Sequence, residues 1–274
     1  MARAIKNQKK FTDGHETNPA QLTGDLRAYL HSEGADLVGF GAVNRLDGAP
    51  EEMHPQRYLS DARYMIAIGL RVNEAVCDLI ARHALNDTEP PSYHSYQLYT
   101  LVMINRELDR LAYLGAKYLE GRGYRAYPFP ANVPHLTKPS KEYPGGPGDV
   151  SHKHIAVACG LGQIGWHSML ITPRFKTRQK LVSIVTDAQL VSPDSPRLHY
   201  NIGTVLYKQK KYDRAVESFR KVISTADEDN LKQKAWYNLG NSYFNQAASA
   251  GDLELLEKAV ESYTEALKIN PNDR

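Results

Sequence analysis

The sequence contains very little cysteine. Only 2 cysteines occur in 274 residues, Cys77 and Cys159, and they are far apart with no Cys-x-x-Cys pair. Two thiols cannot build a disulfide framework or supply the set of thiolates that an iron–sulfur cluster needs. We therefore expect no iron–sulfur cluster on these residues and a reducing compartment, with Cys159 a small buried hydrophobic residue.

Long hydrophobic runs and a strong charge of one sign are also absent. No run of about 18 apolar residues occurs, and the N-terminus lacks the apolar stretch of a signal peptide. We therefore expect a cytoplasmic protein with no membrane partner. Lys and Arg number 34 against 31 Asp and Glu, a formal net charge of +3. Because these charges divide evenly along the chain, we expect no nucleic-acid partner.

The composition is that of a globular protein with two domains. Hydrophobic residues make up 42% and charged residues 24% of the chain, which is ordinary for soluble domains. We predict a flexible N-terminus over residues 1–18 and a first domain over 19–190. The Ser- and Pro-rich letters SPDSP then indicate a linker over 191–197, before a second domain over 198–274.

Helical and extended patterns alternate in the first domain. Asn18 and Pro19 are typical of a helix start, and that helix should end near Gly34. The apolar runs ADLVGFGAV (35–43) and RYMIAIGLRV (63–72) predict neighbouring strands at the centre of a sheet. The longest helical pattern covers 94–121, and YRAYPFP and LVSIVTDA then predict extended structure. Alternation of this kind predicts an α/β sandwich.

A glycine-rich turn follows in the letters GLGQIG. Gly160, Gly162 and Gly165 allow a backbone to lie directly against a ligand, because no side chain intervenes. The alternative is that these glycines only permit close packing of a helix on a strand. A dinucleotide-binding fold would need an acidic residue about 20 positions further on. Asp187 has that spacing, so the sequence alone does not reject this fold.

A wider set of motifs resembles one enzyme family. The letters GDVSHKHIAVACGLGQIGW, LITP and RQKLVSIVTDA resemble the cobalamin-binding core of epoxyqueuosine reductases and reductive dehalogenases. The resemblance covers about residues 20–190. It implies a nitroreductase-like α/β sandwich that holds a corrinoid, and a reduction through low-valent cobalt.

The resemblance also implies individual site residues. It assigns corrin contacts to Gly160, Leu161, Gly162 and Gly165, and to Thr172 of the LITP motif. Many family members have a basic residue after the last glycine of the motif, where this chain has Trp166. The anion or substrate contact of that basic residue is therefore not assigned to Trp166.

Two residues are candidate proton donors. The resemblance implies that Tyr96 could donate a proton beside the cofactor, as tyrosines do in the dehalogenases; a half-buried structural tyrosine on a helix face is the alternative. Asp149 is the acidic residue nearest to the donor of the epoxyqueuosine reductases, although its spacing does not align cleanly.

Two histidines precede the glycine turn. His152 and His154, two residues apart in an extended segment, would point to the same side, which suits a metal pair or a proton shuttle. The alternative is that they hydrogen-bond to the backbone or to side chains of the corrin, and both are therefore candidate cofactor-binding residues. Without a nearby cluster of cysteines or carboxylates, we expect no metal ion held by the protein itself.

The second domain repeats itself. Residues 198–223 and 235–271 match the tetratricopeptide pattern, in which Gly203 and Gly240 occupy equivalent positions. Such repeats predict a protein or peptide partner. The second copy is longer, and AASAG (247–251) is the expected extra loop. Two repeats leave an apolar helix face without a neighbour, which predicts packing on the first domain, on a partner or in a homo-oligomer.

These observations lead to three interpretations. The first is a corrinoid-binding reductase-like domain joined to a protein-interaction module. Because the family's cysteine-rich segment is replaced by repeats, such an enzyme would need an external electron donor. The alternative is a tetratricopeptide adaptor whose first domain has no catalytic activity. The third is a fusion of two unrelated coding segments near residues 189–198.

Overall fold

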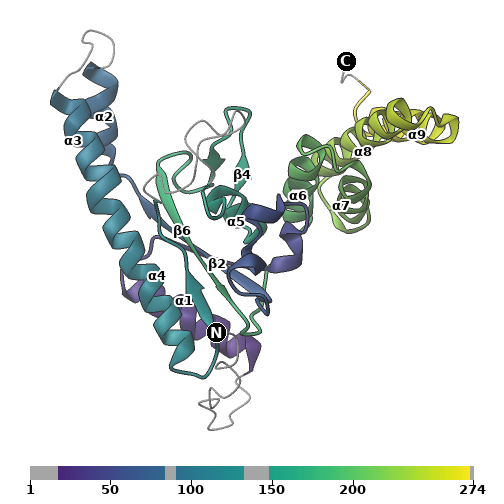
Figure 1. Ribbon diagram of the computed structural model, residues 1–274. Helices are drawn as coiled ribbons and strands as arrows, with labels where there is room; N and C mark the ends of the chain where they lie inside the picture. The colour runs from purple at the N-terminus through teal and green to yellow at the C-terminus, as the bar shows by residue number, and fades with distance from the viewer. Residues whose placement is uncertain (1–17, 84–90, 133–147, 272–274) are drawn as a thin grey trace.

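The computed structural model describes residues 18–83, 91–132 and 148–271. It consists of a mixed α/β region followed by an array of four helices (Figure 1). The prediction for residues 1–18 lies almost entirely outside the described residues. None of the helices in the described part of the chain is long and apolar enough to cross a membrane.

The centre of the α/β region is an antiparallel sheet. Its strands are β1 (Leu37–Ala42), β2 (Tyr64–Arg71), β6 (Gln179–Thr186) and β3 (Ala126–Pro128), in the order β1-β2-β6-β3. The predicted pairing of the first two strands is confirmed, but β1 lies at the edge of the sheet and not at its centre. All three pairings are antiparallel, whereas dinucleotide-binding folds need parallel strands. The described residues therefore exclude that reading of the glycine motif.

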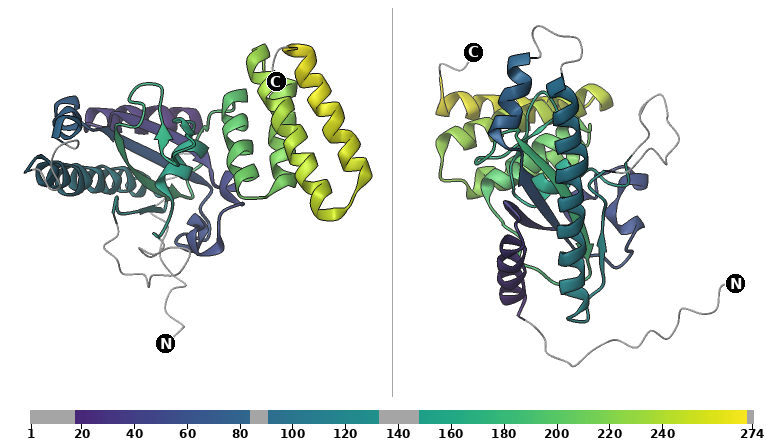
Figure 2. Two further views of the ribbon diagram at one scale, coloured as in Figure 1. Left: turned by 90° about the horizontal axis from the view of Figure 1, so that it is seen from above. Right: turned by 90° about the vertical axis from the view of Figure 1, so that its left-hand side faces the viewer.

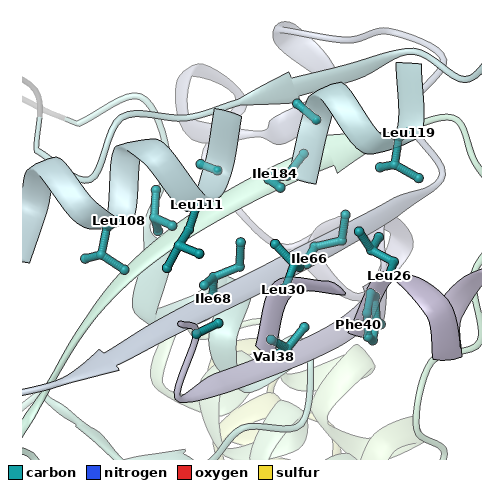
Figure 3. Packing of buried hydrophobic residues seen from close by; sticks show 14 of the residues in the cluster. Leu26, Leu30, Val38, Phe40, Ile66, Ile68, Leu108, Leu111, Leu119 and Ile184 are labelled. Carbon is teal, nitrogen blue, oxygen red and sulfur yellow. The ribbon is translucent and has the colours of Figure 1, made fainter. Parts of the chain in front are cut away.

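Two helices cover one face of this sheet. Helix α1 (Pro19–Ser32) starts as predicted, with the Asn18 side chain accepting a hydrogen bond from the Ala20 amide at 2.8 Å. Helix α4 (Asn105–Glu120) packs beside it. Its predicted N-terminal part is formed by α3 (Pro91–Gln97) and the π-helical segment η4 (Leu98–Ile104). The apolar side chains between helices and sheet include Leu26, Leu30, Phe40, Ile66, Ile68, Leu108, Leu111 and Ile184 (Figure 3).

Helix α5 (His152–Ala158) covers the other face, together with the short helices η1 (Val43–Leu46), η2 (Glu51–Met53) and η3 (Pro55–Arg57). Strand β1 alternates accordingly. A Cβ on Gly39 would lie 2.7 Å from the Cys159 carbonyl oxygen, and one on Gly41 would lie 2.6 Å from that of Ala158. The two glycines therefore let the end of α5 contact the sheet backbone.

Smaller elements complete the α/β region. Helix α2 (Glu74–His83) follows β2, and a two-stranded hairpin of β4 (Gln163–Ile164) and β5 (Leu170–Ile171) follows α5. The chain then returns through β6 to the central sheet. Both α5 and strand β4 of the hairpin pack against α6 of the helical array (Pro196–Lys208), so together they position the candidate site.

The helical array consists of α6 (Pro196–Lys208), α7 (Tyr212–Thr225), α8 (Asp229–Ala250) and α9 (Leu253–Ile269). The prediction of an extra loop at 247–251 is wrong. Helix α8 continues to Ala250 and ends at Gly251, which has a left-handed φ of 68°. Alanine is the best helix former, so the inserted residues extend the helix instead of interrupting it.

The array is held against the α/β region at its first helix, as the view from above shows (Figure 2). The Asn201 side chain of α6 donates a hydrogen bond to the Gly162 carbonyl at 3.2 Å. Arg45 donates to the carbonyls of Ala158 and Pro193, at 2.8 and 2.6 Å. One arginine thus connects the end of α5 to the segment that leads into the repeats.

Candidate functional site

The predicted glycine motif lies between the end of α5 and the β4–β5 hairpin. Gly160 has a φ of 78°, which favours glycine, and a Cβ there would lie 2.9 Å from Pro193. A Cβ on Gly162 would lie 2.2 Å from the Ile171 carbonyl oxygen, and one on Gly165 would lie 2.8 Å from the His167 ring. Packing within the chain itself therefore explains why glycine occupies each of these three positions.

A groove nevertheless runs beside this motif, between the hairpin and the repeats. It consists of two pockets, of about 560 and 250 Å³, that share Gln163, Tyr200 and Asn201 in their walls. We call them together the junction groove. Gly160, Gly162 and Thr172 line the larger pocket. The first domain and helices α6 and α8 of the repeats thus build one concave surface, a common location for binding sites.

Thr172 lies in the wall and is fully buried. Its hydroxyl donates to the Gln179 side chain at 3.0 Å and accepts from the Phe175 amide at 3.1 Å. The side chain therefore shapes the turn after β5. Leu161 faces the opposite direction, because its side chain packs against Gly39 of β1.

The two predicted histidines lie on a helix, which corrects the extended segment that we expected. Residues two apart on a helix point in different directions. The His152 ring hydrogen-bonds through Nδ1 with the Ser183 hydroxyl at 2.9 Å and donates through Nε2 to the Pro130 carbonyl at 3.0 Å. Burial lowers the pKa of His152. Both of its nitrogens are therefore occupied by the protein.

His154 is placed differently, because it lines the smaller pocket of the junction groove. Its Nδ1 hydrogen-bonds with the Ser151 hydroxyl at 2.6 Å. Among the described residues, its Nε2 has no hydrogen-bond partner. Burial, with a smaller contribution from the charge of Lys153, lowers the pKa of His154 to about 4. At neutral pH the groove therefore contains an uncharged imidazole with one nitrogen open to a ligand.

The two predicted proton donors are not brought together. Tyr96 packs against the cluster on the α1 and α4 face of the sheet, where burial raises its pKa. Asp149 lies beside the other face and hydrogen-bonds with Tyr58. Burial and this carboxylate raise the pKa of Tyr58 to about 12. Neither Tyr96 nor Asp149 lines the junction groove.

Cys159 is buried, as expected. Burial raises the pKa of its thiol to about 12, so the reactive thiolate is disfavoured. The described residues contain no group of three or more His, Cys, Asp or Glu side chains that could hold a metal ion.

Tyr200 and Asn201 of α6 are the wall residues that sequence reasoning missed. They lie in both pockets, and Asn201 contacts Gly162 directly. The tetratricopeptide pattern is defined by small and apolar residues that pack within the repeats. It therefore does not predict which polar residues face another domain.

These residues do not fit a corrinoid in the observed arrangement. The glycines that should contact it through backbone are in close contact with Pro193, β5 and His167. Asn201 already binds the Gly162 carbonyl. Pockets of about 300–1,000 Å³ hold drug-sized ligands, whereas a corrin ring with its nucleotide tail is much larger. The larger pocket, of about 560 Å³, could take only a part of it.

Comparison with known proteins confirms the repeats. Residues 196–228 and 233–273 each match a family model described as a tetratricopeptide repeat. No curated protein matches the chain.

Solved structures of two enzyme groups are similar to the chain. A reductive dehalogenase, whose structure suggests a mechanism for B12-dependent dehalogenation, has a TM-score of 0.46 and 14% identity over 66% of this chain and 22% of its own length. An epoxyqueuosine reductase with a tRNA-Tyr stem loop has a TM-score of 0.41 and 13% identity, covering 92% of this chain and 100% of the other. The epoxyqueuosine reductase from Streptococcus thermophilus has a TM-score of 0.38 and 13% identity, and the match covers 89% of this chain and 90% of the reductase.

The chain thus spans less than a quarter of the dehalogenase that it matches. The resemblance that the sequence indicated is found again among solved structures. The chain contains two tetratricopeptide repeats after an α/β region, and it is similar to solved structures of reductive dehalogenases and epoxyqueuosine reductases.

Proposed function

We propose that this chain is a cytoplasmic protein-binding adaptor, in which the two repeats bind a partner and the α/β domain holds the first repeat in place. The observation that carries this proposal is an exposed aromatic face on α8. Tyr237 and Phe244 lie seven residues apart on one side of the helix, and each is 51% exposed. Large aromatic side chains dominate the binding energy of protein interfaces, so two on one face favour a partner there.

The face is held rigid by hydrogen bonds between the repeats. Asn238 donates to the Tyr200 hydroxyl at 2.9 Å, and Asn245 donates to the Tyr207 hydroxyl at 3.0 Å. Both pairs are 38 residues apart in the sequence. The bonds connect α6 to α8 in the same way at two levels, which reduces the entropy that a partner must pay on binding.

Peptide selection on the full-length chain tests this proposal. Peptides enriched from a random library should bind the wild type, and Tyr237→Ala with Phe244→Ala should weaken that binding about tenfold. The matched control is Met103→Ala with Tyr113→Ala, two exposed apolar residues that lie outside the repeats. Failure to enrich any peptide, or equal binding by both double variants, would contradict the adaptor function. Unfolding temperatures confirm that the variants are folded.

Corrinoid binding is the second candidate function. It is favoured by one observation: Gly160, Gly162 and Thr172 line one pocket, and His154 lines the adjoining one. In this case residues 19–190 are a nitroreductase-like sandwich that needs an external electron donor, and 191–197 is a linker. Corrinoid binding would require α6 to move away from Gly162, because the Asn201 side chain is hydrogen-bonded to the Gly162 carbonyl. Cobalamin would supply the redox chemistry when bound.

Absorption spectroscopy with reduced cobalamin tests this candidate. A saturable spectral change would support it, and no change at high micromolar protein would reject it. The matched variant is Asn201→Ala, which removes the hydrogen bond between α6 and the glycine turn and should strengthen binding if α6 must move. The fusion interpretation makes a separate prediction for residues 189–198: source DNA from independent isolates would have the two coding segments apart.

A further inference from the structure

One complete face of α6 lines the junction groove. Arg197, Asn201, Thr204 and Lys208 follow one another at intervals of three or four residues, Tyr200 lies next to Asn201, and all five lie in its walls. Eleven residues separate the first from the last, so the groove is about 16 Å long at a helical rise of about 1.5 Å per residue. That is the length of about five residues of extended chain. A single small anion would fill only one part of it.

The walls of this groove are strongly positive. Their charged side chains are Lys153, Lys176, Arg197, Lys208 and Lys234 against one acid, Glu228. The whole chain has 34 basic and 31 acidic residues, so this excess is local. It arises only when the α/β domain and the repeats are brought together, since two of the lysines come from the first domain and three cations from the second.

Most of these cations retain donors for a ligand. Glu228 pairs with Arg197 at 2.7 Å. Lys153 and Lys176 each donate one bond to a backbone carbonyl, of Ser168 and Pro173. Lys208 and Lys234 are exposed and, among the described residues, have no hydrogen bond or ion pair.

The uncharged walls suit a peptide better than a nucleic acid. Gln163, Asn201, Thr204 and Asn230 offer amide and hydroxyl groups, which can pair with peptide N–H and C=O groups. Single-stranded nucleic acids need aromatic platforms for base stacking. Tyr200 is the only Phe, Tyr or Trp in the described walls, and its hydroxyl already accepts a bond from Asn238. The His154 ring is the only other aromatic group in these walls.

We propose that the junction groove binds an extended acidic segment of a partner protein. Carboxylates of this segment lie at Lys208 at one end and at Lys176 and Lys234 at the other, with the peptide backbone along Asn201. The proposal rests on the adaptor function and names the chemistry of its partner. Lys234 also lies on the α8 face that continues to Tyr237, so an acidic segment followed by an apolar residue would engage both surfaces.

The test uses the full-length chain and a labelled peptide of about ten residues, rich in Asp and Glu, with fluorescence anisotropy as the readout. Lys208→Gln with Lys234→Gln should weaken binding about tenfold. The matched control is Lys210→Gln with Lys232→Gln, which removes the same charge two residues away from each site and should leave affinity unchanged. Binding should also weaken on raising the salt concentration from about 0.1 to 0.5 M.

Three results would overturn the proposal. The first is equal loss in the groove variant and in the control variant. The second is equal affinity for a peptide in which Asn and Gln replace Asp and Glu. The third is that a single-stranded oligoribonucleotide of the same charge binds more tightly than the acidic peptide and depends equally on Lys208 and Lys234. That result would assign the groove to nucleic acid.

The adaptor function is separable from this proposal. If selected neutral peptides bind through Tyr237 and Phe244 while acidic peptides do not bind, the adaptor function stands and the acidic partner is rejected. If neither kind of peptide binds, both proposals are rejected.

Discussion

Glycines have the same structural effect in the α/β domain and in the helical repeats, but their sequence context differs. Gly162 lets β4 approach the Ile171 backbone, while Gly203 and Gly240 let helices pack on the rings of Phe219 and Tyr263. In the repeats, the same glycine recurs with the same kind of neighbour, so the pattern identifies the module. In the α/β domain the motif occurs once. A glycine pattern therefore indicates a function only when its neighbours are known.

The largest expected effect is at Gly162, because its missing Cβ faces backbone. In Gly162→Ala the new methyl group would lie 2.2 Å from the Ile171 oxygen, so the hairpin must shift. We expect a loss of about 3 kcal/mol in the free energy of unfolding, measured by urea denaturation.

Gly24→Ala on α1 is the matched control for that substitution. Nothing lies within 4 Å of its Cβ position, so the helix should gain about 1 kcal/mol from better propensity. Equal stability of the two variants would show that the close contact with the hairpin does not require glycine at position 162.

The second effect concerns pH and is specific to the α/β side of the junction. The folded pKa of His154 is about 4, below the value of about 6.5 for an exposed histidine. Its contribution to stability is therefore complete above about pH 6.5 and is lost as the pH falls towards 4, with an upper limit of about 3 kcal/mol.

The variant His154→Gln isolates this contribution. Urea midpoints measured across this pH range should fall less steeply in the variant than in the wild type. Burial also lowers the pKa of His152. Because His152 is present in both proteins, its contribution to the pH dependence of stability cancels in the comparison. Parallel curves for the two proteins would mean that His154 is accessible to protons in the folded state.

The smallest effect compares the two repeats with each other. A Cβ on either glycine would lie 2.7 Å from a ring carbon, of Phe219 at Gly203 and of Tyr263 at Gly240. Phe219 is fully buried and cannot move, whereas Tyr263 is only partly buried. Gly203→Ala should therefore cost about 2 kcal/mol and Gly240→Ala about 1 kcal/mol in thermal unfolding. The reverse order would mean that the second repeat packs more tightly.

Local patterns predicted the elements of the fold well. The Asn18 cap, the two strands with their glycines and the tetratricopeptide helices all depend on residues close in sequence, whose preferences act over one or two turns. The errors occurred where local preference was ambiguous. AASAG was read as a loop although alanine favours helix, and the segment with His152 and His154 was read as extended although it forms α5.

The candidate site was less predictable than the fold. The motif residues Gly160, Gly162, Thr172 and His154 do line one concave surface. His152 was selected from its spacing to His154, but it is held by the core. Leu161, Tyr96 and Asp149 were assigned by resemblance, and all three lie outside the groove. Which way each side chain points depends on the sheet and on α6, which no local pattern encodes.

The sequence by itself determined that two modules are joined, that the second consists of helical repeats and that few thiols are available. Those properties follow from composition and periodicity. Only the tertiary structure decided that the glycine turn is packed against its own hairpin, and that lysines from both domains meet in one groove. The physical reason is that steric contact and electrostatic potential depend on distances in space between residues far apart in the chain.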